Sequence, residues 1–170
     1  MKNNNLSDNI IYLNSSDNKY RYALGTKGAN TLYCIGINPS TATPQKDDPA
    51  IKRVKKTAEK MGFDSFLMLN IYPQRATNPN NMEDEINQKE HKQSLLAFEL
   101  IKDGASVWAA WGDSIHIRPY LKNCLNDIID LLQRKNINYV KMGELTKRGN
   151  PRYPLFVKYQ PFSEYKINHF

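Results

Sequence analysis

Two asparagines lie at the ends of apolar runs in this chain, and each could recognise a polar ligand. Asn38 follows the run 31–37 and is fixed by Pro39, while Asn70 lies near the end of the run 66–72. Ligands of open α/β sheets bind at the carboxyl ends of the strands. An asparagine amide offers the donor and the acceptor that reading a nucleobase edge requires. The alternative is that each amide only bonds the backbone of the loop after it.

The residues around Asn38 would form one wall of a base-sized pocket. These are Gly36, Ile37, Pro39 and Ser40. Asp48 stands a few residues further along and could act as a general base. It also precedes a proline at the start of a predicted helix, so helix capping explains it equally well.

Aromatic side chains near the predicted strand ends could stack on a base, a contact worth about 1–3 kcal/mol. The candidates are Tyr72, Trp111 with the neighbouring Gly112, and Tyr153. Tyr72 is the preferred one, because it follows Asn70 closely. Most aromatic residues of an α/β domain belong to the core, which is the competing interpretation of all three.

The positive charge of the chain is concentrated towards its C-terminus. The net charge is +7, from 24 basic and 17 acidic residues; residues 134–170 hold 8 basic and 2 acidic side chains (+6), which leaves 16 and 15 (+1) for residues 1–133. This distribution favours a polyanionic partner, most simply nucleic acid and here DNA, although a solubilising basic face is the alternative. Four loop residues suit contact with a phosphate backbone: Arg75, Lys147, Arg148 and Arg152.

Several other classes of protein find no support in the sequence. The histidines and the two cysteines lack metal-ligand spacing, and Walker, GxGxxG and GxSxG motifs are absent. We therefore expect no metal and no cofactor. No apolar stretch approaches the roughly 18 residues of a membrane span, and residues 1–6 lack the apolar core of a secretory signal. We expect a cytoplasmic protein that does not bind membranes.

The order of apolar runs predicts the fold. Strands are expected at 31–37, 66–72, 106–111 and 138–142, separated by helices at 50–61, 82–102 and 119–135. Strands that alternate with helices form a parallel sheet with right-handed crossovers. The prediction is a single three-layer α/β/α domain over residues 20–170, with a central, mostly parallel four-stranded sheet. A polar segment, 1–19, precedes it as a loose arm or an edge hairpin.

Six segments of the chain resemble a bacterial and phage family called domain of unknown function 1643. The resemblance spans roughly residues 18–160, and the segments occur in the right order. They are Tyr20-Arg-Tyr22, Asn38-Pro-Ser-Thr-Ala42, Asp48-Pro-Ala-Ile-Lys-Arg53, Asn70 with Arg75-Ala-Thr77, Ala110-Trp-Gly112 and Gly149-Asn-Pro-Arg-Tyr-Pro-Leu155. The family name supplies no activity.

A more distant resemblance is to the uracil-DNA glycosylase superfamily. Gly36-Ile-Asn-Pro-Ser40 resembles the Gly-Ile-Asn-Pro-Gly motif of the mismatch-specific thymine/uracil branch, which implies that Asn38 positions the attacking water. Leu67-Met-Leu-Asn70 resembles the strand whose terminal Asn recognises uracil, and Trp111-Gly112 stands in the place of a Leu-Gly strand end. Two positions depart from the superfamily. Ser40 replaces a glycine, and Tyr153-Pro154 stands where the superfamily has the His-Pro that stabilises the departing base.

The resemblance implies a uracil-DNA glycosylase-like fold and a protein that binds nucleic acid and recognises or excises a base in a strand-end pocket. The two departures favour binding over vigorous excision. Two alternatives stay open. One is a non-catalytic DNA-binding accessory factor of a mobile element or phage, and the other is an enzyme that acts on a free or modified nucleotide.

Overall fold

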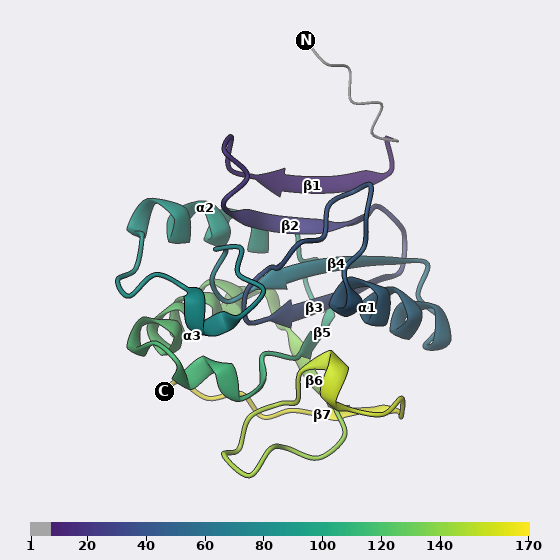
Figure 1. Ribbon diagram of the computed structural model, residues 1–170. Helices are drawn as coiled ribbons and strands as arrows, with labels where there is room; N and C mark the ends of the chain where they lie inside the picture. The colour runs from purple at the N-terminus through teal and green to yellow at the C-terminus, as the bar shows by residue number, and fades with distance from the viewer. Residues whose placement is uncertain (1–7) are drawn as a thin grey trace.

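A computed structural model describes residues 8–170, which form one seven-stranded sheet with helices on both faces (Figure 1). The strands lie in the order β1-β2-β4-β3-β5-β6-β7. Their bounds are β1 Ile10–Asn14, β2 Arg21–Thr26, β3 Thr31–Gly36, β4 Ser65–Asn70, β5 Ser106–Ala109, β6 Asn138–Met142 and β7 Phe162–Glu164. The α-helices are α1 Pro49–Lys60, α2 Gln88–Phe98 and α3 Pro119–Leu132, and short 3₁₀ helices span η1 Pro79–Asn81, η2 Gly112–His116, η3 Gln133–Lys135 and η4 Pro154–Phe156.

The α/β class is as predicted, but the four-stranded sheet is wrong. The four predicted strands form the parallel centre, β4-β3-β5-β6, and three further strands pair with it in antiparallel fashion. Strand β2 covers the β4 edge and β1 covers β2, while β7 pairs with β6. The sheet is therefore mixed, because short strands from both ends of the chain extend it.

The polar N-terminal segment contributes to the sheet. Of its two predicted forms, the edge hairpin is the one present in the described part, since β1 pairs antiparallel with β2. Residues 1–7 of the predicted arm lie outside the described residues.

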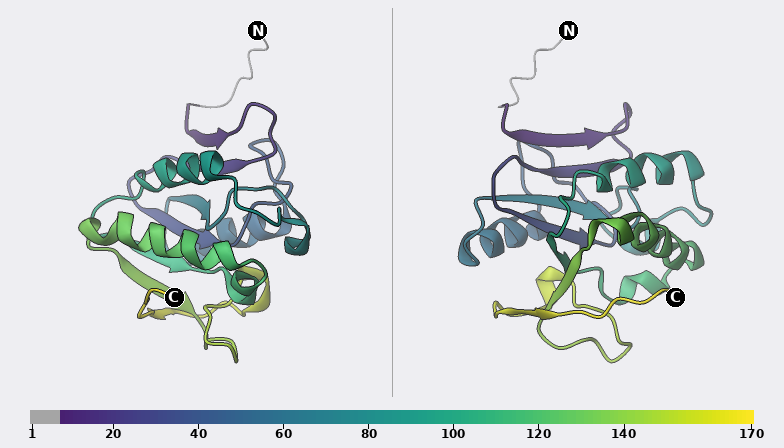
Figure 2. Two further views of the ribbon diagram at one scale, coloured as in Figure 1. Left: turned by 90° about the vertical axis from the view of Figure 1, so that its left-hand side faces the viewer. Right: turned by 180° about the vertical axis from the view of Figure 1, so that it is seen from behind.

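The central strands are buried on both faces, and alternate side chains enter two separate cores. Tyr33 and Ile35 of β3 pack with residues of α2 and α3, whereas Leu32 and Cys34 pack with Ile51 and other residues of α1. Figure 2 shows α2 and α3 on one face of the sheet and α1 on the other. Continuous apolar runs fit this arrangement because neither face of such a strand meets water.

The helix next to the predicted site begins and ends at local signals. The Asp48 side chain accepts a hydrogen bond from the N–H of Ile51 and caps α1, with Pro49 in the first turn. Gly62, at φ +81°, follows the helix. The predicted helix 82–102 is shorter than expected, because Asn87 caps α2 one residue before Gln88.

The sheet register brings three strand ends together. Gly36 at the end of β3 lies opposite Asn70 of β4, and Ile35 lies opposite Ala109 of β5. The loops that follow these strands therefore begin side by side at the carboxyl ends of the strands, as the parallel arrangement predicts. None of the helices within residues 8–170 is long and apolar enough to cross a bilayer.

Candidate functional site

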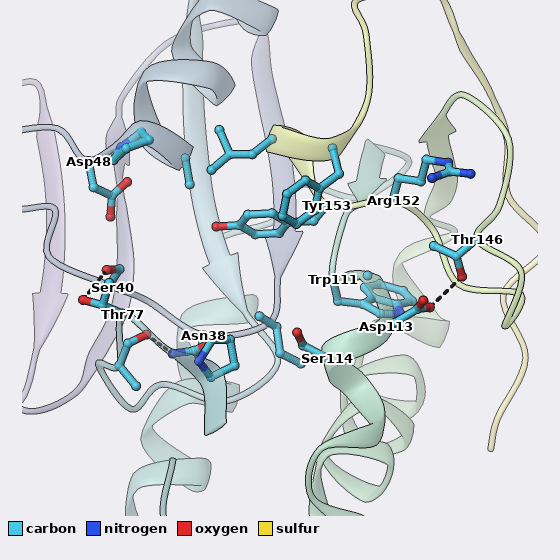
Figure 3. Close-up of a pocket in the computed structure, with 18 of the residues that line it drawn as sticks. Asn38, Ser40, Asp48, Thr77, Trp111, Asp113, Ser114, Thr146, Arg152 and Tyr153 are labelled. Atoms are coloured by element: carbon cyan, nitrogen blue, oxygen red, sulfur yellow. Dashed lines mark hydrogen bonds between the residues drawn. The ribbon is translucent and has the colours of Figure 1, made fainter. Parts of the chain in front are cut away.

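A pocket of about 870 Å³ opens at the carboxyl ends of β3 and β5 (Figure 3). It lies between the start of α1, the loops after β3, β4 and β5, and the segment that leads to η4. Its lining is Ile37, Asn38, Ser40, Asp48, Pro49, Ala50, Ala76, Thr77, Pro79, Trp111, Gly112, Asp113, Ser114, Thr146, Lys147, Arg152, Tyr153, Leu155 and Phe156. The volume lies within the range of ordinary small-molecule sites.

Asn38 lines this pocket and is held there through its amide nitrogen. Nδ2 faces the carbonyl oxygens of Ala76 at 2.9 Å, Pro39 at 3.0 Å and Gln74 at 3.2 Å. Three carbonyl oxygens around one end of the amide identify that end as the donor. Oδ1 has no partner within residues 8–170. The nitrogen bonds the backbone, as the alternative interpretation held, while the oxygen is free to accept a hydrogen bond.

Asp48 caps α1 and also lines the pocket. Its Oδ1 accepts the N–H of Ile51 at 2.9 Å, and its Oδ2 accepts the N–H of Ala42 at 3.2 Å. The capping role is therefore confirmed. Each carboxylate oxygen has a second lone pair, so the cap leaves Asp48 able to accept a proton or a hydrogen bond from a ligand.

Tyr153 directs its hydroxyl into the pocket (Figure 3). The phenol oxygen has no hydrogen-bond partner in the described part of the chain. Burial, with a contribution from the charge of Asp48, raises the pKa of Tyr153 to about 12. The phenol therefore stays protonated at neutral pH and offers a hydrogen bond to whatever enters the pocket.

The Tyr153 segment meets the end of β5 at Gly112. Its φ of +67° is unfavourable for residues with a side chain, and its N–H donates to the carbonyl of Pro151 at 2.9 Å. A Cβ at this position would lie 3.4 Å from Cβ of Tyr153, an ordinary van der Waals contact. The positive φ therefore explains the glycine, and its contact with a base stays a prediction.

Two predicted stacking residues are core residues. Tyr72 is 0% exposed, donates its hydroxyl to Glu83 and packs against Tyr120, so it does not line the pocket and its predicted stacking role is wrong. Burial raises its pKa. Trp111 does line the pocket, but it is only 1% exposed and packs against Tyr165. It forms part of the wall and presents no free face for stacking.

Asn70 is close to the site but does not line it. The side chain is 2% exposed, and neither its nitrogen nor its oxygen has a partner within the described residues. A Cβ on Gly36 would lie 2.9 Å from its Oδ1, so the glycine makes room for the amide. The expected pocket shared by Asn38 and Asn70 is not present as a common surface. A buried amide without partners is unusual, and its reading of a base edge stays a prediction.

Some of the other residues of the 36–40 segment line the pocket, and others hold the segment in place. Ile37 and Ser40 line the pocket. Pro39 is buried, and its carbonyl accepts the N–H of Ala76 at 2.9 Å. The Ser40 hydroxyl donates to Oγ1 of Thr77 at 3.1 Å. These hydrogen bonds therefore hold the segment against the loop after β4.

Three of the four predicted phosphate contacts lie at or near the pocket mouth. Lys147 and Arg152 line the pocket, and Arg148 is exposed on the same loop. Arg152 donates from Nε to the carbonyl of Glu144 at 2.8 Å, and this hydrogen bond fixes the position of the Arg152 side chain. These side chains give the mouth a positive character.

The fourth predicted contact, Arg75, is engaged inside the protein. Its Nη1 donates to the carbonyls of Ser40 at 2.7 Å and Ala42 at 3.1 Å. Its Nη2 donates to the hydroxyl of Tyr12 at 2.6 Å and to Asn18 at 3.2 Å. Direct contact of these groups with a phosphate backbone is thus wrong as a prediction, because their hydrogen-bonding capacity is used to hold the loop after β3.

A polar contact that the sequence did not suggest fixes the loop 146–150. Asp113 accepts from Thr146 at 2.6 Å and from the Asn150 amide nitrogen at 2.8 Å, and these hydrogen bonds lower the pKa of Asp113. The same nitrogen lies 2.9 Å from Nε2 of His116, which must accept and therefore carries no proton there. Burial, with the charges of Arg148 and Lys122, lowers the pKa of His116.

Sequence reasoning also missed part of the lining. Thr77 and Ser114 add hydroxyls, and Leu155 and Phe156 add exposed apolar surface, with Phe156 75% exposed. An exposed aromatic at a pocket mouth is informative only once its exposure is known. Within residues 8–170, no group of three or more His, Cys, Asp or Glu side chains could hold a metal ion.

Comparison with known proteins yields one family. The model of a family described as "Protein of unknown function (DUF1643)" matches residues 21–155, which is most of the chain. No curated protein and no solved structure matches this chain.

Proposed function

The chain belongs to the DUF1643 family, and we propose that it is a cytoplasmic protein that binds DNA and takes a nucleobase into the pocket at the ends of β3 and β5. The base would be turned out of its strand, because a stacked base cannot reach a recessed site. There it is recognised or excised. The unpaired Oδ1 of Asn38 carries this proposal, since it is a fixed acceptor in a pocket of suitable size.

The mouth of the pocket supports a nucleic-acid partner. Lys147 and Arg152 supply positive charge, and Leu155 and Phe156 are 45% and 75% exposed beside them. Basic side chains suit the phosphate backbone, and an exposed aromatic suits stacking on an unpaired base. Phe156 takes over the stacking role expected of Tyr72.

Excision would be hydrolysis of the bond between the sugar carbon and the base. In the proposed step, Oδ1 of Asn38 accepts a hydrogen bond from a water and orients its lone pair towards the sugar carbon. The C–O bond forms as the C–N bond breaks, and the base leaves with the bonding electrons. Tyr153 donates a hydrogen bond to the departing base, and the proton of the water passes to Asp48 or to solvent. Tyr153 would thus serve where the superfamily has its histidine.

The proposal includes a uracil-DNA glycosylase-like arrangement of the fold. The Gly36-Ile-Asn-Pro-Ser40 segment ends β3 and presents Asn38 to the pocket, which supports that likeness. The volume of about 870 Å³ also accommodates more than a bare base. It therefore favours, as a second candidate, action on an enlarged base or a free nucleotide.

A panel of oligonucleotides tests the proposal. Single- and double-stranded probes with uracil, mismatches or modified bases are incubated with the protein, and both binding and alkali-labile sites are measured. We expect binding that weakens steeply with salt and abasic sites in at least one probe. Binding without base loss would identify an accessory factor. Stabilisation by free nucleotides without binding of any oligonucleotide would favour the nucleotide enzyme and contradict the nucleic-acid proposal.

A further inference from the structure

A second cavity, of about 290 Å³, adjoins the main pocket. It is lined by Asn18, Thr41, Arg75 and by three residues that also line the main pocket, Ser40, Ala76 and Thr77. Ser40 and Thr77, whose hydroxyls are joined by a hydrogen bond (Figure 3), therefore stand on the boundary between the two cavities. Any ligand that fills both must pass these hydroxyls.

Two guanidinium groups meet behind this boundary. Arg21 Nη1 and Arg75 Nη1 donate to the same oxygen, the carbonyl of Ala42, at 3.4 Å and 3.1 Å. Arg21 is only 2% exposed. Among residues 8–170 neither arginine forms an ion pair with a carboxylate, and both retain a buried Nε without a partner.

The two arginines leave an excess of positive charge in the protein. Burial, with the like charge of Arg75, lowers the pKa of Arg21 to about 10, so it stays charged at neutral pH. The nearby carboxylate of Asp48 opposes this charge only in part, since two cations face one anion. Buried charges are normally paired, and this arrangement is short of one negative charge.

The peptide between Ser40 and Thr41 provides a polarised N–H donor at a residue that lines the small cavity. The Ser40 carbonyl accepts from Arg75 Nη1 at 2.7 Å. In a trans peptide the following N–H points the opposite way, and a hydrogen bond to the carbonyl strengthens that N–H as a donor. The N–H of Thr41 has no partner within the described residues, and Thr41 is exposed.

We propose that the small cavity is a phosphate subsite of the main pocket. The hydroxyls of Ser40 and Thr77 and the N–H of Thr41 contact the phosphate, while Arg21 and Arg75 supply the positive field from behind. The ligand class is a nucleotide, with its base in the main pocket and its phosphate in the small cavity. This inference rests on the proposed function, because it assumes that the main pocket takes a base.

The chemistry of the lining favours a phosphate over a neutral group. The three contacts are uncharged donors of the kind that bind phosphate oxygens in nucleic-acid complexes. No carboxylate lines the small cavity within the described residues, and the Asp48 oxygens already accept two backbone N–H donors. The Nη groups of Arg75 already donate to four acceptors within the protein, so in the proposed site the two arginines act through charge and through the loop that they hold.

The test compares four nucleosides with their 5′- and 3′-monophosphates by calorimetry and by thermal shift. For at least one base we expect the monophosphate to bind about tenfold more tightly than the nucleoside, since charge-assisted hydrogen bonds are the strong ones. A double variant, Ser40→Ala with Thr77→Val, should remove this advantage. A matched pair, Thr31→Val with Ser65→Ala, deletes a similar hydroxyl contact at the amino ends of β3 and β4. This control should retain the advantage of the monophosphate.

A second measurement does not depend on a variant that folds. The Thr41 amide resonance of the wild-type protein should shift on addition of the monophosphate and not on addition of the nucleoside. Equal affinity of nucleosides and monophosphates, or a double variant that keeps the advantage, would overturn the phosphate subsite. Oligonucleotide binding without any phosphate advantage would contradict the subsite alone. Monophosphate binding without oligonucleotide binding would contradict the proposed function alone.

Discussion

The carbonyl oxygen of Ala76, in the loop after β4, lies 2.9 Å from the amide nitrogen of Asn38 at the end of β3. This contact ties two loops of neighbouring strands together and fixes which end of the amide is free. The orientation of Asn38 is therefore set before a ligand arrives, as a preorganised site requires.

Replacing Asn38 by aspartate should destabilise the fold as well as the site. In Asn38→Asp a carboxylate oxygen would face three carbonyl oxygens and could donate nothing to them. We expect a loss of about 1–3 kcal/mol in the free energy of unfolding, measured by urea denaturation. The exposed Asn123→Asp, on α3, should change stability by less than about 0.5 kcal/mol. Equal effects of the two substitutions would contradict the assigned hydrogen bonds.

Two tyrosines should respond in opposite ways to loss of their hydroxyls. Tyr72→Phe leaves the carboxylate of Glu83 short of a donor, so we expect lower stability and unchanged ligand binding. Tyr153→Phe removes an unpaired hydroxyl that faces the pocket, so stability should hold while binding or excision weakens. Denaturation and oligonucleotide binding, measured on both variants, check this pair. A binding defect confined to Tyr72→Phe would contradict the assignment of its hydroxyl to a purely structural contact.

Gly112→Ala should change the pocket wall as well as the backbone. The positive φ carries a strain of about 1–3 kcal/mol for a residue with a side chain. The new methyl group would stand in ordinary contact with Tyr153, another residue of the pocket lining. Gly104→Ala is the matched control, because its φ of +73° is similar and nothing lies within 4 Å of the added Cβ. We expect only Gly112→Ala to weaken ligand binding; the same binding defect in both would point to general destabilisation.

The contact between Asn150 and His116 should make stability depend on pH. Asn150 donates to His116 only while Nε2 is unprotonated, and the pKa of His116 is lowered from its ordinary 6.5 mainly by burial. The folded state therefore binds fewer protons than the unfolded chain. The stability from this group is complete above pH 6.5 and is lost as the pH falls through the lowered folded pKa.

His116→Gln isolates that dependence. All other ionisable groups are the same in both proteins, so their contributions cancel in the comparison. Urea midpoints measured between about pH 7.5 and about pH 5 should fall more steeply for the wild-type protein. Parallel curves would show that the contact does not sense pH.

The parallel centre of the fold could be predicted because its signals are local. Long apolar runs mark β3 and β4, and Asp48 with Pro49 marks the start of α1. Strands β1 and β7 are short and partly exposed, so only their pairing with β2 and β6 makes them strands. Such pairing is tertiary information.

The site could be predicted where it follows directly from a strand end. Asn38 and Ser40 line the pocket for this reason. Tyr72 lies beyond the end of β4, where the alternation of a strand no longer sets the direction of a side chain. The hydrogen bond between Asp113 and Asn150 joins residues 37 positions apart, and no spacing along the chain suggests it.

The most direct test of the nucleobase pocket uses the best oligonucleotide from the panel with wild-type protein, Asn38→Ala and Asn123→Ala. Binding and the formation of alkali-labile sites are measured on folded samples, checked by circular dichroism. We expect wild-type protein and Asn123→Ala to bind the probe and release its base, and Asn38→Ala to leave the base in place. Full base release by Asn38→Ala, or failure of the wild-type protein to bind any probe, would contradict a nucleobase pocket built on Asn38.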